Sequence, residues 1–133
     1  GEGVLIGGYS RNFAMMFGSP YFSFDPNADY ILFIEDHERF SKPDAVSEYL
    51  AAIWQHPFMR RVRGFIFGCY NNAGTPPEEL VALLALIGER YGIPVAYTND
   101  IGHGTRRGVL PMGCRVRLDG GAGTLEFLER TIL

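Results

Sequence analysis

Apolar residues along the chain fall into short runs, and the spacing within each run predicts a strand or a helix. The runs at 30–35 and 64–68 are continuously apolar up to their ends, as in strands buried on both faces of a parallel sheet. Shorter apolar runs at 4–6 and 93–97 predict two further strands. The pattern therefore predicts a buried sheet as the centre of the fold.

Helical spacing marks the segments between these strands. After the start signal Ser-Lys-Pro-Asp at 41–44, apolar residues recur on one helical face until Pro57 ends the run. Thr-Pro-Pro-Glu at 75–78 has the form of a capping box, and the apolar face that follows ends at Gly92, a typical C-terminal cap. A shorter helix is predicted at 10–17. The chain therefore alternates strand and helix.

This alternation across 30–97 predicts two βαβ units and a parallel core sheet. The C-terminal part differs, because 109–110, 114–118 and 124–128 resemble short strands and Asp-Gly-Gly at 119–121 is typical of a hairpin turn. The predicted fold class is α/β, with a parallel core sheet and a smaller antiparallel layer, in a single domain spanning 1–133.

The composition of the chain excludes two classes of partner. The chain has 133 residues, 47% hydrophobic and 20% charged, which allows a core without metals or disulfides. Its net charge of −3 provides no basic field for nucleic acid. No segment reaches the ~18 apolar residues that span a bilayer. We therefore expect neither a nucleic-acid partner nor a membrane partner.

The two cysteines bear on the cellular location of the protein, and the first residues bear on whether it is part of a longer chain. Cys69 and Cys114 form no CxxC motif, so buried reduced thiols and a cytoplasmic location are expected. The chain starts at Gly1 without an initiator methionine, so we expect it to be an excised part of a longer protein.

Glu35 and His103 are the candidate catalytic residues. Glu35 ends the apolar run at 30–35, where the carboxyl ends of parallel strands face the ligand crevice. His103 lies between Gly102 and Gly104, which permit a tight turn. A carboxylate and an imidazole are two members of a hydrolytic triad. The alternative, a surface carboxylate and an ordinary loop histidine, remains open on local sequence alone.

A third triad member and a metal site are harder to find. Gly8-Tyr9-Ser10 lies between a strand and a helix, as in a nucleophile elbow, but Asn12 stands where that motif has glycine. Ser10 is otherwise explained as a helix N-cap. Asp36 and His37 match no strong zinc spacing, so neither a metal nor a cofactor is expected.

Several segments, taken in order, resemble a known family. They are 5–8, 18–21, 31–36, 64–68, 93–95 with 102–103, and 110–113. Together they are similar to the C-terminal domain of the LD-carboxypeptidases, serine peptidases that include the microcin C self-immunity hydrolases. Tyr9 replaces the family's usual asparagine, and Cys69 stands where arginine is common.

The resemblance implies a swivelling β/β/α domain in which Glu35 orients His103 and His103 acts as the general base. It also implies that the nucleophile lies in a Gly-Tyr-Ser-Asp elbow on an N-terminal domain that this chain lacks. That domain is the expected partner, and the chain alone is expected to be inactive. A homodimer is a further possibility that the resemblance allows.

The reaction implied by the resemblance is hydrolysis of an amide bond beside a free carboxylate. The substrate is a small peptide-like molecule, either a murein tetrapeptide during peptidoglycan recycling or a microcin-like peptidyl or aminoacyl nucleotide. Two alternatives stay open. One is a non-catalytic module that binds a small carboxylated ligand, and the other is a self-contained hydrolase that uses Ser10.

Overall fold

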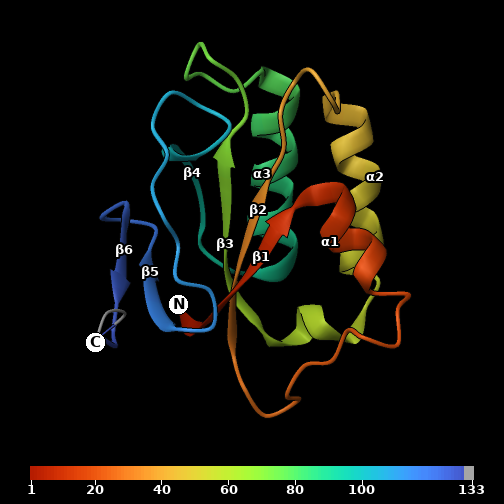
Figure 1. Cartoon of the computed structure of the whole chain (residues 1–133), viewed down its shortest axis with the longest axis vertical. Helices are drawn as coiled ribbons and strands as arrows, with labels where there is room; N and C mark the ends of the chain where they lie inside the picture. Colours follow the sequence, from red (N-terminus) through yellow and green to blue (C-terminus); the bar gives the residue numbers. More distant parts are fainter. Residues whose placement is uncertain (131–133) are drawn as a thin grey trace.

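A six-stranded mixed sheet forms the centre of the computed structural model, which describes residues 1–130 (Figure 1). The strand order is β4-β3-β2-β1-β5-β6. The strands are β1 (Glu2–Tyr9), β2 (Tyr30–Glu35), β3 (Val62–Cys69), β4 (Val95–Gly102), β5 (Arg115–Asp119) and β6 (Thr124–Phe127). Strands β1 to β4 pair in parallel, and β5 and β6 extend the β1 edge with antiparallel pairing. The predicted α/β class is therefore confirmed.

The helices all contribute to the same core, on one face of the sheet. They are α1 (Ser10–Met16), α2 (Pro43–Trp54) and α3 (Glu78–Tyr91), with a 3-10 turn at Pro57–Arg61. Side chains alternate between the two faces of a strand, so Leu32 and Ile34 of β2 point toward the helices. Phe65 and Phe67 of β3 join the same cluster. The cluster is completed by residues from the helices, among them Phe13, Val46, Leu50, Ile53, Leu80, Leu84 and Ile87.

The opposite face of the sheet has a smaller core. Ile31 and Phe33 of β2 pack there with Leu5 and Ile66, and Val116 and Leu118 of β5 join them. Ile101 and Leu110, from the end of β4 and the segment after it, pack against this cluster. The loop that carries His103 therefore lies beside this smaller core, to which the helices contribute no buried residue.

Most predicted elements are present, but several boundaries differ. The first strand runs on through the two glycines to Tyr9, and the fourth runs from Val95 to Gly102. The segment 109–110, predicted as a strand, has no regular structure. It crosses the smaller core with Leu110 as its apolar contact, which accounts for its apolar character without strand pairing.

Two predicted helix caps are wrong. Thr75 does not cap α3, because the helix begins at Glu78 with Pro77 at the N-cap in extended geometry and no side-chain cap. Pro77 has ψ 154°, which is outside the helical region, and its ring disfavours helical geometry at Pro76, so the helix begins only after both prolines. Ser10 is likewise not the N-cap of α1, since Tyr9 holds that position and Ser10 is the first helical residue.

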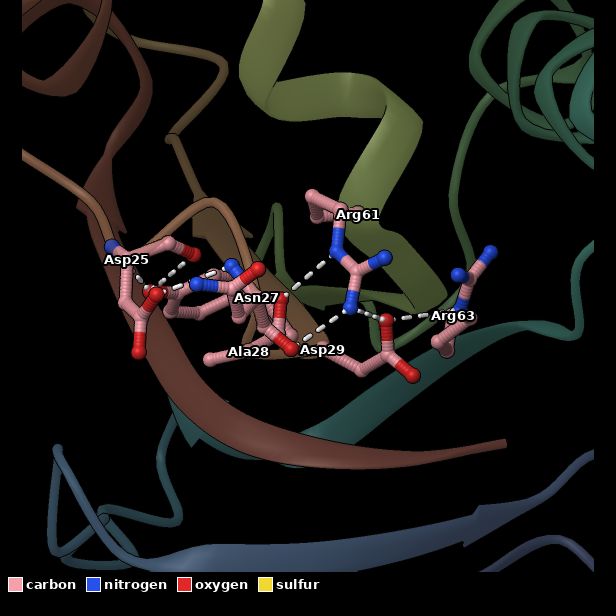
Figure 2. A network of polar contacts seen from close by, with 7 residues as sticks. Asp25, Asn27, Ala28, Asp29, Arg61 and Arg63 are labelled. Atoms are coloured by element: carbon pink, nitrogen blue, oxygen red, sulfur yellow. Dashed lines mark hydrogen bonds and ion pairs between the residues drawn. The ribbon is translucent and has the colours of Figure 1, made fainter.

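A polar network fixes the sheet at the amino end of β2 (Figure 2). Oδ1 of Asp29 lies 2.8 Å from Nη2 of Arg61 and 3.0 Å from Nε of Arg63. The Arg61 guanidinium also donates to the carbonyls of Ala28, at 2.9 Å, and Asn27, at 2.8 Å. These contacts tie the turn before β2 to the start of β3.

Candidate active site

Glu35 and His103 lie together at the carboxyl end of the parallel sheet, although 68 positions separate them in sequence. Glu35 is the last residue of β2, and His103 follows β4 directly. Oε2 of Glu35 lies 3.0 Å from Nδ1 of His103. The Glu35 side chain is 22% exposed and that of His103 is 37% exposed, so the pair is reachable from solvent without being fully hydrated.

The glycines around His103 allow this approach. Gly102 has φ +108°, and a Cβ there would lie 2.8 Å from the amide nitrogen of Cys69 and 3.2 Å from Oε2 of Glu35. A Cβ on Gly104 would lie 2.5 Å from Sγ of Cys69. The amide of His103 donates to the Cys69 carbonyl at 3.3 Å. The turn therefore needs glycine at 102 for its backbone angle and at 104 for close packing.

The hydrogen bond between the two side chains determines what the imidazole can do. A proton on Nδ1 donates to the Glu35 carboxylate and leaves Nε2 as the acceptor of the neutral ring. Within residues 1–130, Nε2 of His103 makes no hydrogen bond. A carboxylate in this position also stabilises the ring once it is protonated. An imidazole arranged in this way is able to act as a general base.

His103 lines an open pocket of about 340 Å³. The other residues lining it are Tyr9, Arg11, Asn12, Phe40 and Ser41. The His103 ring lies 5.8 Å from the Tyr9 ring, edge to face, and 6.2 Å from that of Phe40. Two aromatic rings thus hold the imidazole beside a space the size of a small ligand.

Ser10 is not exposed as a nucleophile. Its side chain is fully buried, and its hydroxyl donates to Oδ2 of Asp36, which is also fully buried. The amide of His37 donates to Oδ1 of the same carboxylate at 2.7 Å. Ser10 does not line the pocket beside His103. This geometry gives Ser10 a structural role and counts against Ser10 as the nucleophile of a self-contained hydrolase.

Asp36 is the residue whose role the sequence did not reveal. It anchors α1 and the loop after β2 through two hydrogen bonds. A signal was present, because alternation along β2 places residue 36 on the same face as Leu32 and Ile34, under the helices. A carboxylate on that face must find donors to be buried.

No metal site is evident among the described residues. Residues 1–130 contain no group of three or more His, Cys, Asp or Glu side chains placed to hold an ion. Nδ1 of His37 accepts a hydrogen bond from the amide of Arg39 at 3.1 Å.

Within residues 1–130, every helix is too short or too polar to cross a lipid bilayer.

Two tyrosines near the site hold their protons strongly. Burial raises the pKa of the Tyr9 hydroxyl, and the nearby Asp36 carboxylate raises it further. Burial also raises the pKa of Tyr70 to about 12, with the charges of Asp36 and Glu38 adding to the effect. The Tyr70 hydroxyl donates to the Ser41 carbonyl at 2.5 Å. Both hydroxyls therefore act as neutral donors.

Comparison with known sequences identifies the family. Residues 2–118 match the LD-carboxypeptidase C-terminal domain. The chain therefore belongs to the LD-carboxypeptidase family of serine peptidases and corresponds to its C-terminal domain. It is 29% identical over 119 residues to a predicted carboxypeptidase of Treponema pallidum (strain Nichols), a match that covers 88% of this chain and 34% of the relative.

Solved structures share the fold. A muramoyltetrapeptide carboxypeptidase from Oxalobacter formigenes is 26% identical with a TM-score of 0.74, over 93% of this chain and 43% of that one. An MccF-like protein from Streptococcus pneumoniae, in complex with AMP, is 22% identical with a TM-score of 0.77, over 95% of this chain and 40% of that one. The chain thus spans about a third of the Treponema relative and about two fifths of these structures.

Proposed function

We propose that this chain is the part of a serine LD-carboxypeptidase that supplies Glu35 and His103 to a Ser-Glu-His triad. The observation that carries the proposal is the 3.0 Å contact between Oε2 of Glu35 and Nδ1 of His103 beside an open pocket. The serine lies on an N-terminal domain of the same parent protein. The burial of Ser10 supports a nucleophile from outside this chain.

The proposed reaction follows from the proton on Nδ1 of His103, because this proton leaves Nε2 of the ring free to act as the base. Nε2 of His103 takes the proton of the incoming serine hydroxyl as its oxygen attacks the carbonyl carbon of the substrate amide. Glu35 stabilises the resulting imidazolium and keeps the ring in one orientation. The imidazolium then gives its proton to the leaving amine, which leaves an acyl-enzyme. Water, deprotonated by the same ring, hydrolyses that ester.

We propose that the substrate is a murein tetrapeptide, cleaved before its terminal residue in the cytoplasm. The muramoyltetrapeptide carboxypeptidase from Oxalobacter formigenes supports this choice, because its 26% identity extends over 93% of the chain. The similarity to MccF-like proteins lies at 22% identity and concerns the fold. The two free cysteines, Cys69 and Cys114, are compatible with a reducing compartment.

The test uses the full-length parent protein and a muramoyl tetrapeptide, with release of the terminal D-alanine as the measurement. His103→Ala should lower kcat by at least about 10³-fold, because the general base is lost. The control is His56→Asn, since the His56 ring accepts a hydrogen bond from the Phe58 amide that asparagine can also accept. This control should keep normal turnover.

Three outcomes count against the proposal. Normal turnover by His103→Ala would remove the general base from the mechanism. Cleavage of tetrapeptide by the 133-residue chain without its parent domain would show that the nucleophile lies within this chain. Tight binding of the tetrapeptide by a parent protein that does not cleave it would favour the non-catalytic binding module.

A further inference from the structure

Arg11 is the one permanently charged side chain among the described residues that line the pocket beside His103. We propose that Arg11 binds the carboxylate of the substrate's terminal residue and so selects substrates that end in a free acid. This inference rests on the proposed function, because it assigns a binding role within that same site. It names the residue that recognises the anionic end of the substrate.

Arg11 has no carboxylate partner within residues 1–130. Five arginines there pair with acids, namely Arg61, Arg63, Arg106, Arg115 and Arg117, whereas Arg11 shares its lack of an acidic partner with arginines that lie outside the pocket, such as Arg39. No Asp or Glu oxygen of the described residues lies within 4.0 Å of the Arg11 guanidinium. The side chain is exposed, so its donors are available to a ligand. A guanidinium binds a carboxylate through two parallel hydrogen bonds.

The backbone at Arg11 is held in place relative to the catalytic pair. Ser10, which precedes it, is fixed by its hydrogen bond to the buried Asp36. Tyr9 lies on the other side of Ser10 and packs edge-on against the His103 ring at 5.8 Å. Tyr9 and Arg11 line the same pocket, and the positive charge of Arg11 opposes the rise in the pKa of the Tyr9 hydroxyl. Arg11 and His103 thus flank Tyr9 in one pocket.

The size and polarity of the pocket favour the end of a peptide. At about 340 Å³ it lies near the lower limit of ligand pockets and is large enough for the terminal residue of a peptide. Asn12 and Ser41 add uncharged polar groups to its lining. A single guanidinium among neutral groups favours one negative charge on the ligand. A terminal carboxylate beside the scissile amide has that charge.

The experiment compares two substrates in the parent protein. One is the muramoyl tetrapeptide with its free terminal carboxylate, and the other is the same peptide with a terminal carboxamide. Arg11→Ala should lower kcat/KM for the free acid by about 10- to 100-fold, mainly through KM, because a charge-assisted contact is lost. The carboxamide should be cleaved equally well by both proteins. Arg11→Lys should recover part of the loss.

A matched control distinguishes a direct contact between Arg11 and the substrate from the general electrostatic effect of a positive charge nearby. Arg39 is an exposed arginine on the loop after β2 and does not line the pocket. Arg39→Ala removes the same charge nearby and should leave both substrates unaffected. An equal loss in Arg39→Ala, or an equal loss on both substrates in Arg11→Ala, would overturn the assignment.

Inhibition distinguishes a carboxylate from a phosphate. Free D-alanine should inhibit the wild-type parent and lose potency in Arg11→Ala, whereas AMP should keep the same potency in both. If only AMP loses potency, Arg11 recognises a phosphoryl group and the proposal fails. These failures differ from failure of the proposed function, in which the wild-type parent cleaves neither peptide or His103→Ala retains full turnover.

Discussion

The two ends of β2 carry carboxylates in opposite settings. At the amino end, Asp29 meets two guanidiniums, Arg61 and Arg63, which keep their charge at every pH of interest (Figure 2). At the carboxyl end, Glu35 meets one imidazole, a group that can accept and donate a proton in a reaction. The first arrangement is fixed in charge, while the second can change its charge during a reaction.

This difference shows how one strand can serve both stability and chemistry. Asp29 pairs with Arg61 and Arg63, and the Arg61 guanidinium also donates to two backbone carbonyls, so these contacts fix the turn before β2. The pair of Glu35 and His103 leaves one ring nitrogen available beside a pocket. We infer that the sheet separates fixed charges from reactive ones by its two ends.

The largest expected effect is from removing the charge at the carboxyl end. In the parent protein, Glu35→Gln should lower kcat by roughly 10³- to 10⁴-fold with a smaller change in KM, because the ring loses its orienting and stabilising charge. Asp29→Asn makes the same chemical change at the amino end and should leave kcat unchanged. Equal losses of kcat in the two variants would contradict the comparison.

An intermediate effect is expected on the stability of the fold at alkaline pH, and it comes from Tyr70, which directly follows β3. Its pKa is about 12 in the folded protein and about 10 when unfolded, so the folded state holds the proton more tightly. Between pH 10 and 12 the unfolded state therefore binds fewer protons, and stability falls by roughly 1 kcal/mol per pH unit. Below pH 10 this contribution is fully present.

Urea unfolding at a series of pH values measures this slope. Tyr70→Phe keeps the ring and removes the hydroxyl, so its stability should fall less steeply between pH 10 and 12 than that of the wild type. Because the variant also loses the hydrogen bond to the Ser41 carbonyl, the comparison concerns the slope and not the absolute stability. Identical slopes would show that Tyr70 does not hold its proton as described.

The smallest effect is expected at the amino end. The Arg63 and Asp29 side chains are 43% and 39% exposed, so their ion pair is screened by water. Arg63→Ala should lower the free energy of unfolding by at most about 1 kcal/mol, and less at high salt. Urea unfolding at low and high salt measures this. A salt-independent loss of several kcal/mol would show that the network acts through packing.

The sequence predicted the sheet well because buried strands leave a strong pattern. The continuous apolar runs of β2 and β3 are typical of strands buried on both faces of a sheet. The helical spacing of apolar residues in α2 and α3 gives each helix one apolar face to bury. Helix caps were predicted less well, since Thr75 precedes two prolines that delay the start of α3. Local motifs cannot show such a delay unless the backbone angles are known.

The candidate site was predictable only in part. Glu35 and His103 stood out because one ends a strand and the other lies between glycines, and the structure places them 3.0 Å apart. The roles of Asp36 and Arg11 depend on where α1 docks, which is a tertiary contact between residues far apart in sequence. Alternation along β2 indicates that Asp36 lies beneath the helices, but the partner of Asp36 and the position of Arg11 cannot be read from spacing along the chain.

Glu35 and Asp36 are consecutive, yet they serve opposite sides of the sheet. Glu35 contacts the loop that carries His103, and Asp36 contacts Ser10 beneath the helices. Deleting one residue from the middle of β2 would move Asp36 into the place that Glu35 holds and would turn Glu35 toward the helices, one position too early to meet Ser10. Inserting one residue would move Glu35 into the place of Asp36 and carry Asp36 past it, so either change in strand length would separate both acids from their partners.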